Sequence, residues 1–409
     1  MSLDFERCVA EEYCIKVADG THDSPKEVDY GKKLVTSKNI IGGKLDLDKS
    51  YFISLGDFDD INKRSKVDQW DILISMIGTV GEVALITEKP DFAIKNVGLL
   101  KNDNEYKAKW LYYYLKSDLG QYQIKSRLRG TTQLYIPLKD LRKLEISVPK
   151  DHDDMIKIIK ILDNIDKKIE NNLNINNNLE NLLMEIFKSW FIYFEKYDKS
   201  NGMKIDESYG ELPKLWSVEM LEDYVDFVTG VEPGSKNYHE NPEVNDVPFL
   251  RVGDLGSRES TVFIDESLSK NKILTFEDIV LSLDATIGIV KIGLEGAYST
   301  GMRKLVIKNN NINKPFLYCL IKSERIQKII ETFATGTTIL HAGKSIKHMN
   351  FVLSDKYTMD KFAEIGNPIL STILSNLKEI EILINMRDTL LPKLMSGEID
   401  VSKINCDLD

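Results

Sequence analysis

Residues 71–83 read DILISMIGTVGEV, and a closely similar stretch, DIVLSLDATIGIV, occupies residues 278–290. The shared aspartate, serine, threonine, glycine and valine keep their spacing, so a constant offset of 207 residues relates the two stretches. Each copy combines β-branched and apolar residues with a glycine turn, a pattern typical of two strands joined by a tight connection. Self-similarity at a fixed interval indicates a duplicated structural unit.

A second match is the tripeptide Gly-Thr-Thr, which stands at residues 130–132 and again at 336–338, an offset of 206. Each copy follows a segment with the periodicity of an amphipathic helix, 110–128 in one case and 316–333 in the other. The same order of strand, helix and turn patterns therefore occurs twice in the chain.

The segments that follow the two repeats carry heptad patterns. In the first, apolar and polar side chains recur with strict four–three spacing at Ile158, Leu162, Ile165, Ile169, Asn172, Asn176, Leu179, Leu183, Ile186 and Trp190. In the second, the positions are Leu370, Ile373, Leu377, Ile380, Ile384, Arg387, Leu391 and Leu394. Such spacing is typical of coiled-coil seams and predicts helices over 155–194 and 369–395, about 60 Å and about 40 Å long.

The centre of the first seam is polar. Seven of the eleven residues 171–181 are asparagine, a composition that also occurs in low-complexity segments. Because the heptad continues through this stretch, a helix is favoured, with Asn172 and Asn176 fixing the register of the pairing at some cost in stability.

The end of the first seam is rich in aromatic residues. Four side chains there exceed what a two-helix seam buries, namely Trp190, Phe191, Tyr193 and Phe194. Two interpretations stay open: they pack inside the chain, against the second globular domain, or they contact a partner protein.

These patterns divide the chain into four parts. Residues 1–150 and 201–358 are predicted to form two similar globular domains, and residues 151–200 and 359–409 the helical segments that follow them. The predicted fold class is α+β, with the two domains separated by two long antiparallel, coiled-coil-like helices. The boundary at residues 198–202 is polar and turn-forming.

Composition excludes several classes of protein. The chain has 409 residues, of which 42% are hydrophobic, and it contains no apolar run near the ~18 residues that a membrane-spanning helix needs. The N-terminus does not resemble a signal peptide. Its cysteines, Cys8, Cys14, Cys319 and Cys406, form no CxxC pair, so neither a disulfide framework nor a cysteine zinc site is expected. A cytoplasmic protein with reduced thiols is the expectation.

The charge is unevenly distributed. The whole chain carries a net charge of −10, which argues against a nucleic-acid partner. Residues 101–150, however, carry +6 and residues 301–350 carry +7, and each of these basic blocks contains one Gly-Thr-Thr copy. Two basic faces held apart by long helices suit two grooves of one DNA duplex, whose helical turn is about 34 Å.

The basic blocks supply the candidate DNA-binding residues, because Lys and Arg bind phosphates while Arg, Gln, Thr and His also reach base edges. In the first block the candidates are Lys125, Arg127, Arg129, Thr131, Thr132, Gln133, Tyr135 and Lys139. In the second block they are Arg303, Lys304, Thr337, Thr338, His341, Lys344, Ser345 and Lys347. A purely structural role for the glycine and threonines, as a turn between helix and strand, stays open.

Four motifs carry a resemblance to a known family. The first two are Asp19-Gly20-Thr21-His22-Asp23-Ser24-Pro25 and the Gly-Thr-Thr copies with the strand Leu144-Glu145-Ile146-Ser147-Val148-Pro149. The others are Ile161-Leu162-Asp163-Asn164-Ile165-Asp166 with Phe187-Lys188-Ser189-Trp190-Phe191, and Arg387-Asp388-Thr389-Leu390-Leu391-Pro392-Lys393-Leu394-Met395-Ser396-Gly397-Glu398-Ile399. Nearly the whole chain thereby resembles the specificity (S) subunit of type I restriction–modification systems.

The resemblance implies a non-catalytic subunit that reads a bipartite double-stranded DNA target, one half-site per target-recognition domain. It adds Thr21 and His22 to the DNA-binding candidates. It implies assembly with two modification subunits, which bind S-adenosylmethionine and methylate adenine, and with restriction subunits that use ATP and Mg²⁺ where these are present. No cofactor or metal is expected in this chain itself.

The two copies also differ. The second copy has Thr229-Gly230-Val231-Glu232-Pro233 where the first has Asp19-Gly20-Thr21-His22, and its Gly-Thr-Thr precedes Ile339-Leu340-His341 rather than Gln133-Leu134-Tyr135. These differences leave open which residues of the second domain contact bases.

Two functions other than DNA recognition also fit parts of the sequence. A stand-alone nuclease would use Asp91, Glu105 and Lys107, because two carboxylates and a lysine can hold Mg²⁺ and activate water. A coiled-coil protein-interaction module would use the basic blocks to bind acidic proteins. Gly343-Lys344-Ser345 resembles the end of a phosphate-binding loop, but the glycine required at its start is Thr338.

Overall fold

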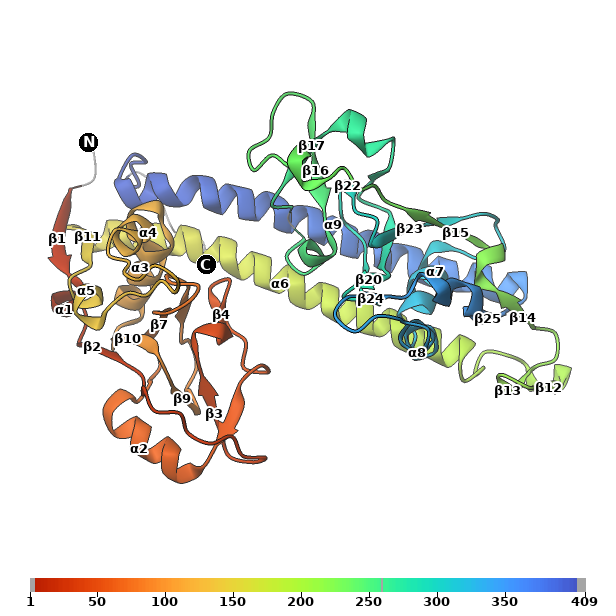
Figure 1. Ribbon diagram of the computed structural model, residues 1–409, viewed down its shortest axis with the longest axis horizontal. Coiled ribbons are helices and arrows are strands. Elements are labelled where there is room, and N and C mark those ends of the chain that lie inside the picture. The colour runs from red at the N-terminus through yellow and green to blue at the C-terminus, as the bar shows by residue number, and fades with distance from the viewer. Residues whose placement is uncertain (1–3, 259, 403–409) are drawn as a thin grey trace. The chain divides into compact units, whose positions relative to one another are not determined.

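The computed structural model describes residues 4–258 and 260–402 (Figure 1). The chain divides into two compact units. The first unit comprises Met1–Lys168 with Leu383–Asp409, and the second comprises Ile169–Ile382. Cys8, Cys14 and Cys319 are free thiols, and Cys406 lies outside the described residues.

The first unit is built around a four-stranded antiparallel sheet of order β2-β10-β7-β8, accompanied by the sheets β6-β3-β9, β1-β11 and β4-β5. Its strands are β1 (Phe5–Val9), β2 (Lys16–Asp19), β3 (Lys32–Val35), β4 (Ile40–Ile41), β5 (Lys44–Leu45), β6 (Tyr51–Ile53), β7 (Ile72–Ser75), β8 (Val83–Leu85), β9 (Phe92–Ile94), β10 (Val97–Lys101) and β11 (Glu145–Pro149). Its short helices are α1 (Ala10–Tyr13), α2 (Leu55–Ser65), α3 (Glu105–Lys116), α4 (Asp118–Lys125) and α5 (Leu138–Arg142). In Figure 1, α2 lies at one end of this unit and α3 and α4 at the other.

The second unit has a matching four-stranded sheet of order β15-β23-β19-β21, with the sheets β17-β16-β22-β18, β14-β25, β12-β13 and β20-β24. Its strands are β12 (Met203–Asp206), β13 (Gly210–Pro213), β14 (Ser217–Met220), β15 (Val225–Thr229), β16 (Asp246–Leu250), β17 (Phe263–Asp265), β18 (Ile273–Leu274), β19 (Ile279–Ser282), β20 (Asp284–Ala285), β21 (Val290–Lys291), β22 (Gly296–Tyr298), β23 (Met302–Ile307), β24 (Leu340–His341) and β25 (Asn350–Leu353). Its short α-helices are α7 (Lys314–Lys322) and α8 (Glu324–Thr332).

The duplicated sequence corresponds to duplicated structure. The stretch 71–83 forms β7, a turn and β8, and the stretch 278–290 forms β19, the two-residue strand β20, a turn and the start of β21. Both are antiparallel pairs inside the four-stranded sheets, with Leu73 paired to Ala84 in one and Val280 to Lys291 in the other. In each unit a two-helix segment then leads toward the Gly-Thr-Thr tripeptide. The predicted α+β fold of two similar globular domains is confirmed.

Two long helices complete the fold, and both predicted helices exist with different bounds. Helix α6 spans His152–Phe191, so it begins and ends three residues before the prediction. Helix α9 spans Lys356–Ser396 and begins well before Ile369. The sequence Gly366-Asn367-Pro368 weakens the helical pattern there, yet Gly366 is required because a Cβ would lie 2.4 Å from Cβ of Pro315.

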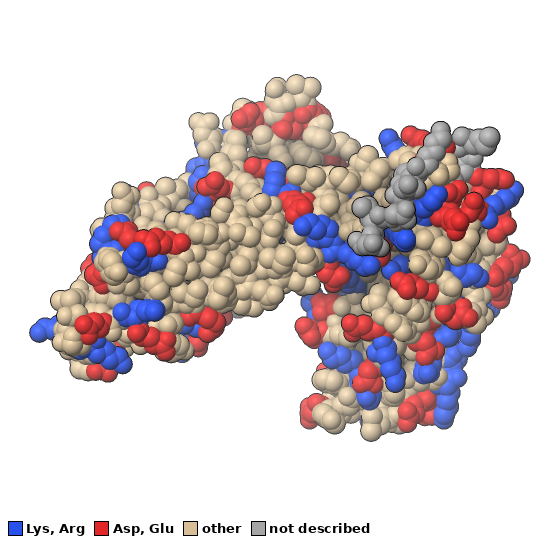
Figure 2. Space-filling model, turned by 180° about the vertical axis from the view of Figure 1, so that it is seen from behind, with Lys and Arg blue, Asp and Glu red and all other residues tan. Residues whose placement is uncertain are grey.

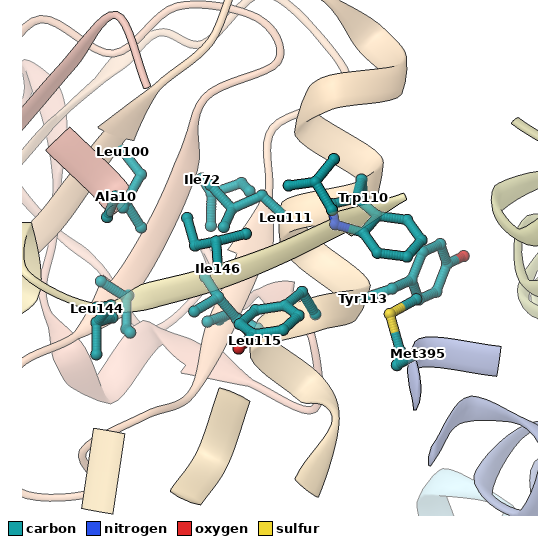
Figure 3. Close-up of a cluster of buried hydrophobic side chains, with 14 of the residues drawn as sticks. Ala10, Ile72, Leu100, Trp110, Leu111, Tyr113, Leu115, Leu144, Ile146 and Met395 are labelled. Atoms are coloured by element: carbon teal, nitrogen blue, oxygen red, sulfur yellow. The ribbon is translucent and has the colours of Figure 1, made fainter. Parts of the chain in front are cut away.

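The helix pair is part of the core of the first unit. Trp110 of α3 is fully buried and donates Nε1–H to the carbonyl oxygen of Ser147 at 3.0 Å. Around it packs an apolar cluster drawn from the sheet and the helices, whose members include Ile72, Leu100, Leu111, Ile146, Ile158, Leu162, Leu391, Leu394 and Met395 (Figure 3). The first turns of α6 thus pack with the last turns of α9, in antiparallel order.

In the second unit the corresponding packing is aromatic. Phe191 of α6 lies 4.9 Å from the ring of Phe316 and 5.1 Å from that of Phe362, between ring centroids. Phe187 and Phe191 are buried, whereas the predicted seam positions Ile186 and Trp190 are half-buried. The seam shifts by one residue because a straight α-helix has 3.6 residues per turn and drifts from a heptad repeat.

This packing decides between the two interpretations of the aromatic end of α6. Trp190 packs against Phe362, and Phe194 packs against Trp216 at 5.5 Å. Phe191 is buried and these contacts leave Trp190 and Phe194 half-buried, while Tyr193 is 62% exposed. Intramolecular packing therefore accounts for three of the four aromatic residues.

The polar centre of the seam is buried and hydrogen-bonded. Asn176, 6% exposed, donates to the carbonyl oxygen of Ile373 at 3.3 Å and accepts from Asn376 at 2.8 Å. Asn172 donates to Glu379 at 2.7 Å. An amide pair across the helices tolerates only one register, because any shift leaves buried polar atoms without partners.

No helix within residues 4–258 and 260–402 is long and apolar enough to cross a membrane.

Candidate nucleic-acid interface

The first Gly-Thr-Thr copy forms the tip of a short hairpin in the first unit. Arg129 and Tyr135 close this hairpin by two reciprocal backbone hydrogen bonds, each of 2.9 Å. Gly130 has φ +95°, and a Cβ there would lie 2.3 Å from the carbonyl oxygen of Gln133. Only glycine fits this left-handed position without strain. Residues 131–135 are all exposed.

The second copy forms the same hairpin in the second unit. Thr335 and His341 are joined by reciprocal backbone hydrogen bonds of 3.0 and 2.8 Å. Gly336 has φ +105°, and a Cβ there would lie 2.1 Å from the carbonyl oxygen of Ile339. Residues 337–341 are exposed. The tripeptide is therefore a structural turn that also presents its threonines to solvent.

The repeated stretches 71–83 and 278–290 hold these hairpins in place. In the first unit the Ser75 hydroxyl donates to the carbonyl oxygen of Thr79, and it accepts from the Glu82 amide at 2.9 Å. Ser282 makes the equivalent bonds to Thr286 at 2.6 Å and Ile289 at 2.8 Å.

In each unit the residue that follows the hairpin is hydrogen-bonded to the repeated stretch. The Ile136 amide donates to the carbonyl oxygen of Met76 at 3.0 Å, and the Ala342 amide donates to that of Leu283 at 2.7 Å. The two hairpins are thus seated on equivalent strand ends.

The candidates of the first block differ in how far they are available to a ligand. Lys125 of α4 and Lys139 of α5 are exposed. Arg129 forms an ion pair with Asp140 at 2.7 Å but keeps 60% of its side chain exposed. Arg127 is half-buried and bonds Gln123 at 2.5 Å and the carbonyl oxygen of Lys143 at 3.3 Å. Arg127 therefore braces the base of the hairpin.

The second block shows the same division. Lys344 and Lys347, in the 3₁₀ helix Gly343–His348, are exposed. His341 is 61% exposed, and its Nδ1 lies 2.7 Å from Asp284 Oδ1. These three side chains flank the second hairpin and are available to a ligand.

The other three candidates of the second block are engaged within the protein. Lys304 pairs with Asp278 at 2.7 Å, and the buried Ser345 hydroxyl donates to the carbonyl oxygen of Ala342 at 2.6 Å. Arg303 donates to the carbonyl oxygens of Thr300 and Met302, and burial lowers the pKa of its guanidinium. Their side chains support the site.

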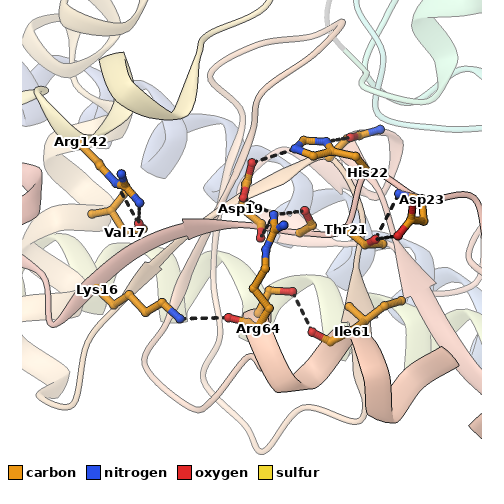
Figure 4. A network of polar contacts seen from close by, with 12 residues as sticks. Lys16, Val17, Asp19, Thr21, His22, Asp23, Ile61, Arg64 and Arg142 are labelled. Atoms are coloured by element: carbon orange, nitrogen blue, oxygen red, sulfur yellow. Dashed lines mark hydrogen bonds and ion pairs between the residues drawn. The ribbon is translucent and has the colours of Figure 1, made fainter. Parts of the chain in front are cut away.

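The loop after β2 contains Thr21 and His22 and is held by a polar network (Figure 4). The buried carboxylate of Asp19 accepts from Arg64 at 2.5 Å and lies 3.1 Å from His22 Nε2. The other ring nitrogen of His22 lies 2.8 Å from Asn96 Oδ1, and the ring is 66% exposed. His22 is thus oriented on both sides while facing solvent. Thr21 bonds Asp23 within the loop.

The equivalent loop of the second unit has the same backbone and different side chains. Gly20 and Gly230 both lie against a neighbouring strand, where a Cβ would approach a carbonyl oxygen to 2.4 and 2.1 Å. Two residues beyond the glycine, the first unit has His22 and the second has the exposed Glu232.

A hollow of about 280 Å³ lies beside the first of these loops. Its lining includes Thr21, Asp23, Asp57, Asp60 and Arg64. Three carboxylates against one guanidinium give this hollow an acidic lining, which repels phosphate.

Charges of both signs share the molecular surface. On the face shown in Figure 2, basic and acidic side chains lie intermingled over most of the charged area.

The residues of the nuclease hypothesis are paired with basic or aromatic groups instead of with one another. Asp91 accepts from Lys32 at 2.7 Å, and Glu105 pairs with Lys109 at 2.7 Å. Lys107 lies over the ring of Tyr13 at 5.6 Å. Within residues 4–258 and 260–402 no cluster of three His, Cys, Asp or Glu side chains is placed to hold a metal ion.

Comparisons with known proteins agree with the duplicated architecture. Residues 23–181 and 213–355 match the family described as the type I restriction modification DNA specificity domain. The type I restriction enzyme MjaIX specificity subunit of Methanocaldococcus jannaschii is 30% identical over 313 residues, which cover 73% of this chain and 70% of that protein. The HindI specificity subunit of Haemophilus influenzae is 24% identical, over 66% of this chain and 72% of its own. A solved S subunit from M. genitalium has a TM-score of 0.57 at 20% identity and covers 96% of both chains, a likeness of fold.

Proposed function

The chain belongs to the family of type I restriction modification DNA specificity domains, and we propose that each of its two units reads one half of a split DNA target. It is a sequence-specific DNA-recognition subunit, and it is not itself an enzyme. The observation that carries the two-half-site proposal is the pair of equivalent hairpins, each exposed at its tip and differing in the side chains beside the shared threonines.

The proposed recognition domains are residues 1–150 and 201–358, and the proposed spacer helices are residues 151–200 and 359–409. In the first domain the DNA-facing residues are Thr21, His22, Lys125, Arg129, Thr131, Thr132, Gln133, Tyr135 and Lys139. In the second they are Thr337, Thr338, His341, Lys344 and Lys347. Arg127, Arg303, Lys304 and Ser345 act as supports, because their side chains are engaged within the protein.

The proposed DNA contacts are of two kinds, those to phosphates and those to base edges. Exposed lysines neutralise phosphates and supply affinity that is independent of sequence. The hydroxyl, amide and imidazole groups of Thr131, Gln133 and His341 donate to and accept from base edges, which supplies sequence preference. Because Gln133 and Tyr135 of the first unit correspond to Ile339 and His341 of the second, the two half-sites of the target differ.

Type I specificity subunits assemble with the other subunits of their systems. For this chain, two modification subunits are the proposed partners, and the S-adenosylmethionine that methylates adenine binds to them. ATP and Mg²⁺ would bind restriction subunits where these are present. A subunit that directs the methylation of chromosomal DNA by its partners works where that DNA lies, so the cytoplasm is the proposed location.

Sequencing of methylated adenines tests the function directly. A host that carries the chain with its modification subunits is expected to show one split methylated motif, and deletion of the gene for this chain is expected to remove it. The variants Thr131→Ala with Thr132→Ala, and Thr337→Ala with Thr338→Ala, are expected to relax different halves of that motif. Methylation that persists unchanged without this chain contradicts the proposal.

A further inference from the structure

The two hairpins share one feature beyond the glycine and the threonines, an exposed leucine. Leu134 is 45% exposed and Leu340 is 36% exposed. They stand at the same position, four residues after Gly130 and Gly336 respectively. The residues on either side differ, since Gln133 and Tyr135 correspond to Ile339 and His341.

A single exposed leucine needs no explanation, but one at the same position of both hairpins does. Nothing in the geometry of the turn requires it: the glycine and the closing backbone bonds define the hairpin, and both leucines lie outside the described apolar cores. Leucine is retained where both neighbours have changed, so its apolar side chain serves something common to the two units.

The backbone holds each leucine in a fixed place. The carbonyl oxygen of Leu134 accepts from the Gly78 amide at 3.3 Å, and Leu340 in β24 pairs with Ala285 in β20. Gly78 and Ala285 are themselves equivalent, and both have positive φ, +81° and +58°. Because the backbone at each leucine is already ordered, contact with a ligand costs little backbone conformational freedom.

The charges around the two leucines indicate which ligand they contact. Exposed cations flank both leucines, Lys139 and Arg129 in the first unit, Lys344 and Lys347 in the second. A hairpin of this size fits the major groove of duplex DNA, where the only apolar feature of the base edges is the C5 face of the pyrimidine, methylated in thymine.

We propose that Leu134 and Leu340 each contact the C5 face of one pyrimidine in the major groove, one in each half-site. This assignment rests on the proposed function. Gly-Thr-Thr then supplies the turn and polar contacts that both half-sites share, the leucine reads a methyl group, and the variable neighbours distinguish the remaining base edges.

The test uses the complex with its modification subunits and duplexes that contain the motif found by methylation sequencing. Every base pair has one pyrimidine, so each thymine is replaced in turn by deoxyuridine and each cytosine by 5-methylcytosine. The wild type is expected to bind the C5-methylated form about fourfold more tightly at one pair in each half-site. Leu134→Ala is expected to abolish that difference in one half-site only, and the matched variant Leu340→Ala in the other only.

Thermal unfolding and co-purification with the modification subunits check that both variants remain folded and assembled. The proposal is overturned if the wild type binds its motif specifically but is insensitive to C5 methylation at every pair, or if the sensitivity survives in Leu134→Ala. A complex with no preference for its motif over other duplexes contradicts the proposed function itself. An apolar contact with a protein partner is indicated instead if the variants lose subunit assembly and keep C5 sensitivity.

Discussion

The two units use the same backbone for two different surfaces. Both close a hairpin on a left-handed glycine and anchor it on a serine-braced turn. The first hairpin presents Gln133 and Tyr135 beside its leucine, whereas the second presents Ile339 and His341. The loop that follows β2 presents His22, whereas the equivalent loop after β15 presents Glu232. What the fold requires is therefore kept in both copies, and what faces solvent has diverged.

The units also attach to the long helices with different chemistry. In the first, Tyr113 of α3 donates to Asp166 of α6 at 3.0 Å, and Arg387 of α9 bonds the same carboxylate at 3.0 Å. In the second, Tyr318 and Lys322 of α7 bond Glu180 of α6 at 2.6 and 2.7 Å. Each unit thus bonds a carboxylate of α6 through a tyrosine and a basic side chain.

The largest expected effect tests whether each unit has its own core. Trp110→Ala removes a fully buried side chain from the first unit, and Phe316→Ala removes one from the second. Each is expected to lower the free energy of unfolding by about 3–5 kcal/mol. Under limited proteolysis, Trp110→Ala should expose cleavage sites in residues 1–150 and Phe316→Ala in residues 201–358. Equal exposure of both regions in both variants would show that the units unfold as one.

The parts of the fold that were predictable follow from local patterns. The repeat, both long helices and the seam positions Ile158, Leu162 and Leu394 were readable because burial on one face imposes a period on the sequence. The start of α9 was not, because the neighbour that makes Gly366 necessary, Pro315, lies far away in the sequence.

The carboxylate attachments provide the next comparison. Burial raises the pKa of Glu180, but Lys322 and Tyr318 outweigh it, and the net shift is downward. A lowered carboxyl pKa contributes stability above the ordinary value of about 4.3, and this contribution is lost as the pH falls through the lowered pKa. Glu180→Gln is therefore expected to cost about 1.5–3 kcal/mol at pH 7 and progressively less in acid.

Chemical denaturation of Glu180→Gln at several pH values measures this effect. Asp166→Asn is the matched variant of the first unit and is expected to lose a similar amount at pH 7, because it also removes a charge bonded by two groups. A cost for Glu180→Gln that is the same at pH 7 and pH 3 would show that its charge does not contribute.

In the seam of the second unit, a second substitution is expected to reverse the change in the free energy of unfolding that the first one causes. Asn176→Leu alone leaves the half-buried amide of Asn376 without its acceptor and is expected to destabilise by about 1–2 kcal/mol. Replacing both by leucine removes the unsatisfied group and is expected to recover that loss or exceed it, while relaxing the register. Urea denaturation measures the first effect, and methylation of targets with altered spacers measures the second. A double variant less stable than the single one contradicts this account.

The candidate site was less predictable than the fold. Composition placed Arg303 and Lys304 among the DNA-binding candidates because they lie in a basic block, but both are engaged by groups that the fold brings to them. Asp140, which pairs with Arg129, and Asn96, which orients His22, are polar residues without a sequence signal of their own. Such partners are fixed by strand order, which a local pattern does not encode.

The smallest expected effect is that of removing one exposed lysine, and it distinguishes phosphate contacts, which supply affinity, from base contacts, which supply sequence preference. Lys139 and Lys344 are exposed beside the two hairpins. If each neutralises a phosphate, Lys139→Ala and Lys344→Ala should weaken binding by a few fold on every duplex and lower the slope of log K against log salt by about 0.9 each. Salt titrations on the methylated motif and on an unrelated duplex measure both slopes. A loss of affinity for the motif alone, with binding to the unrelated duplex unchanged, would instead show that the lysine contacts a base. In that unit the basic side chain, like the hairpin, would then contribute to sequence recognition.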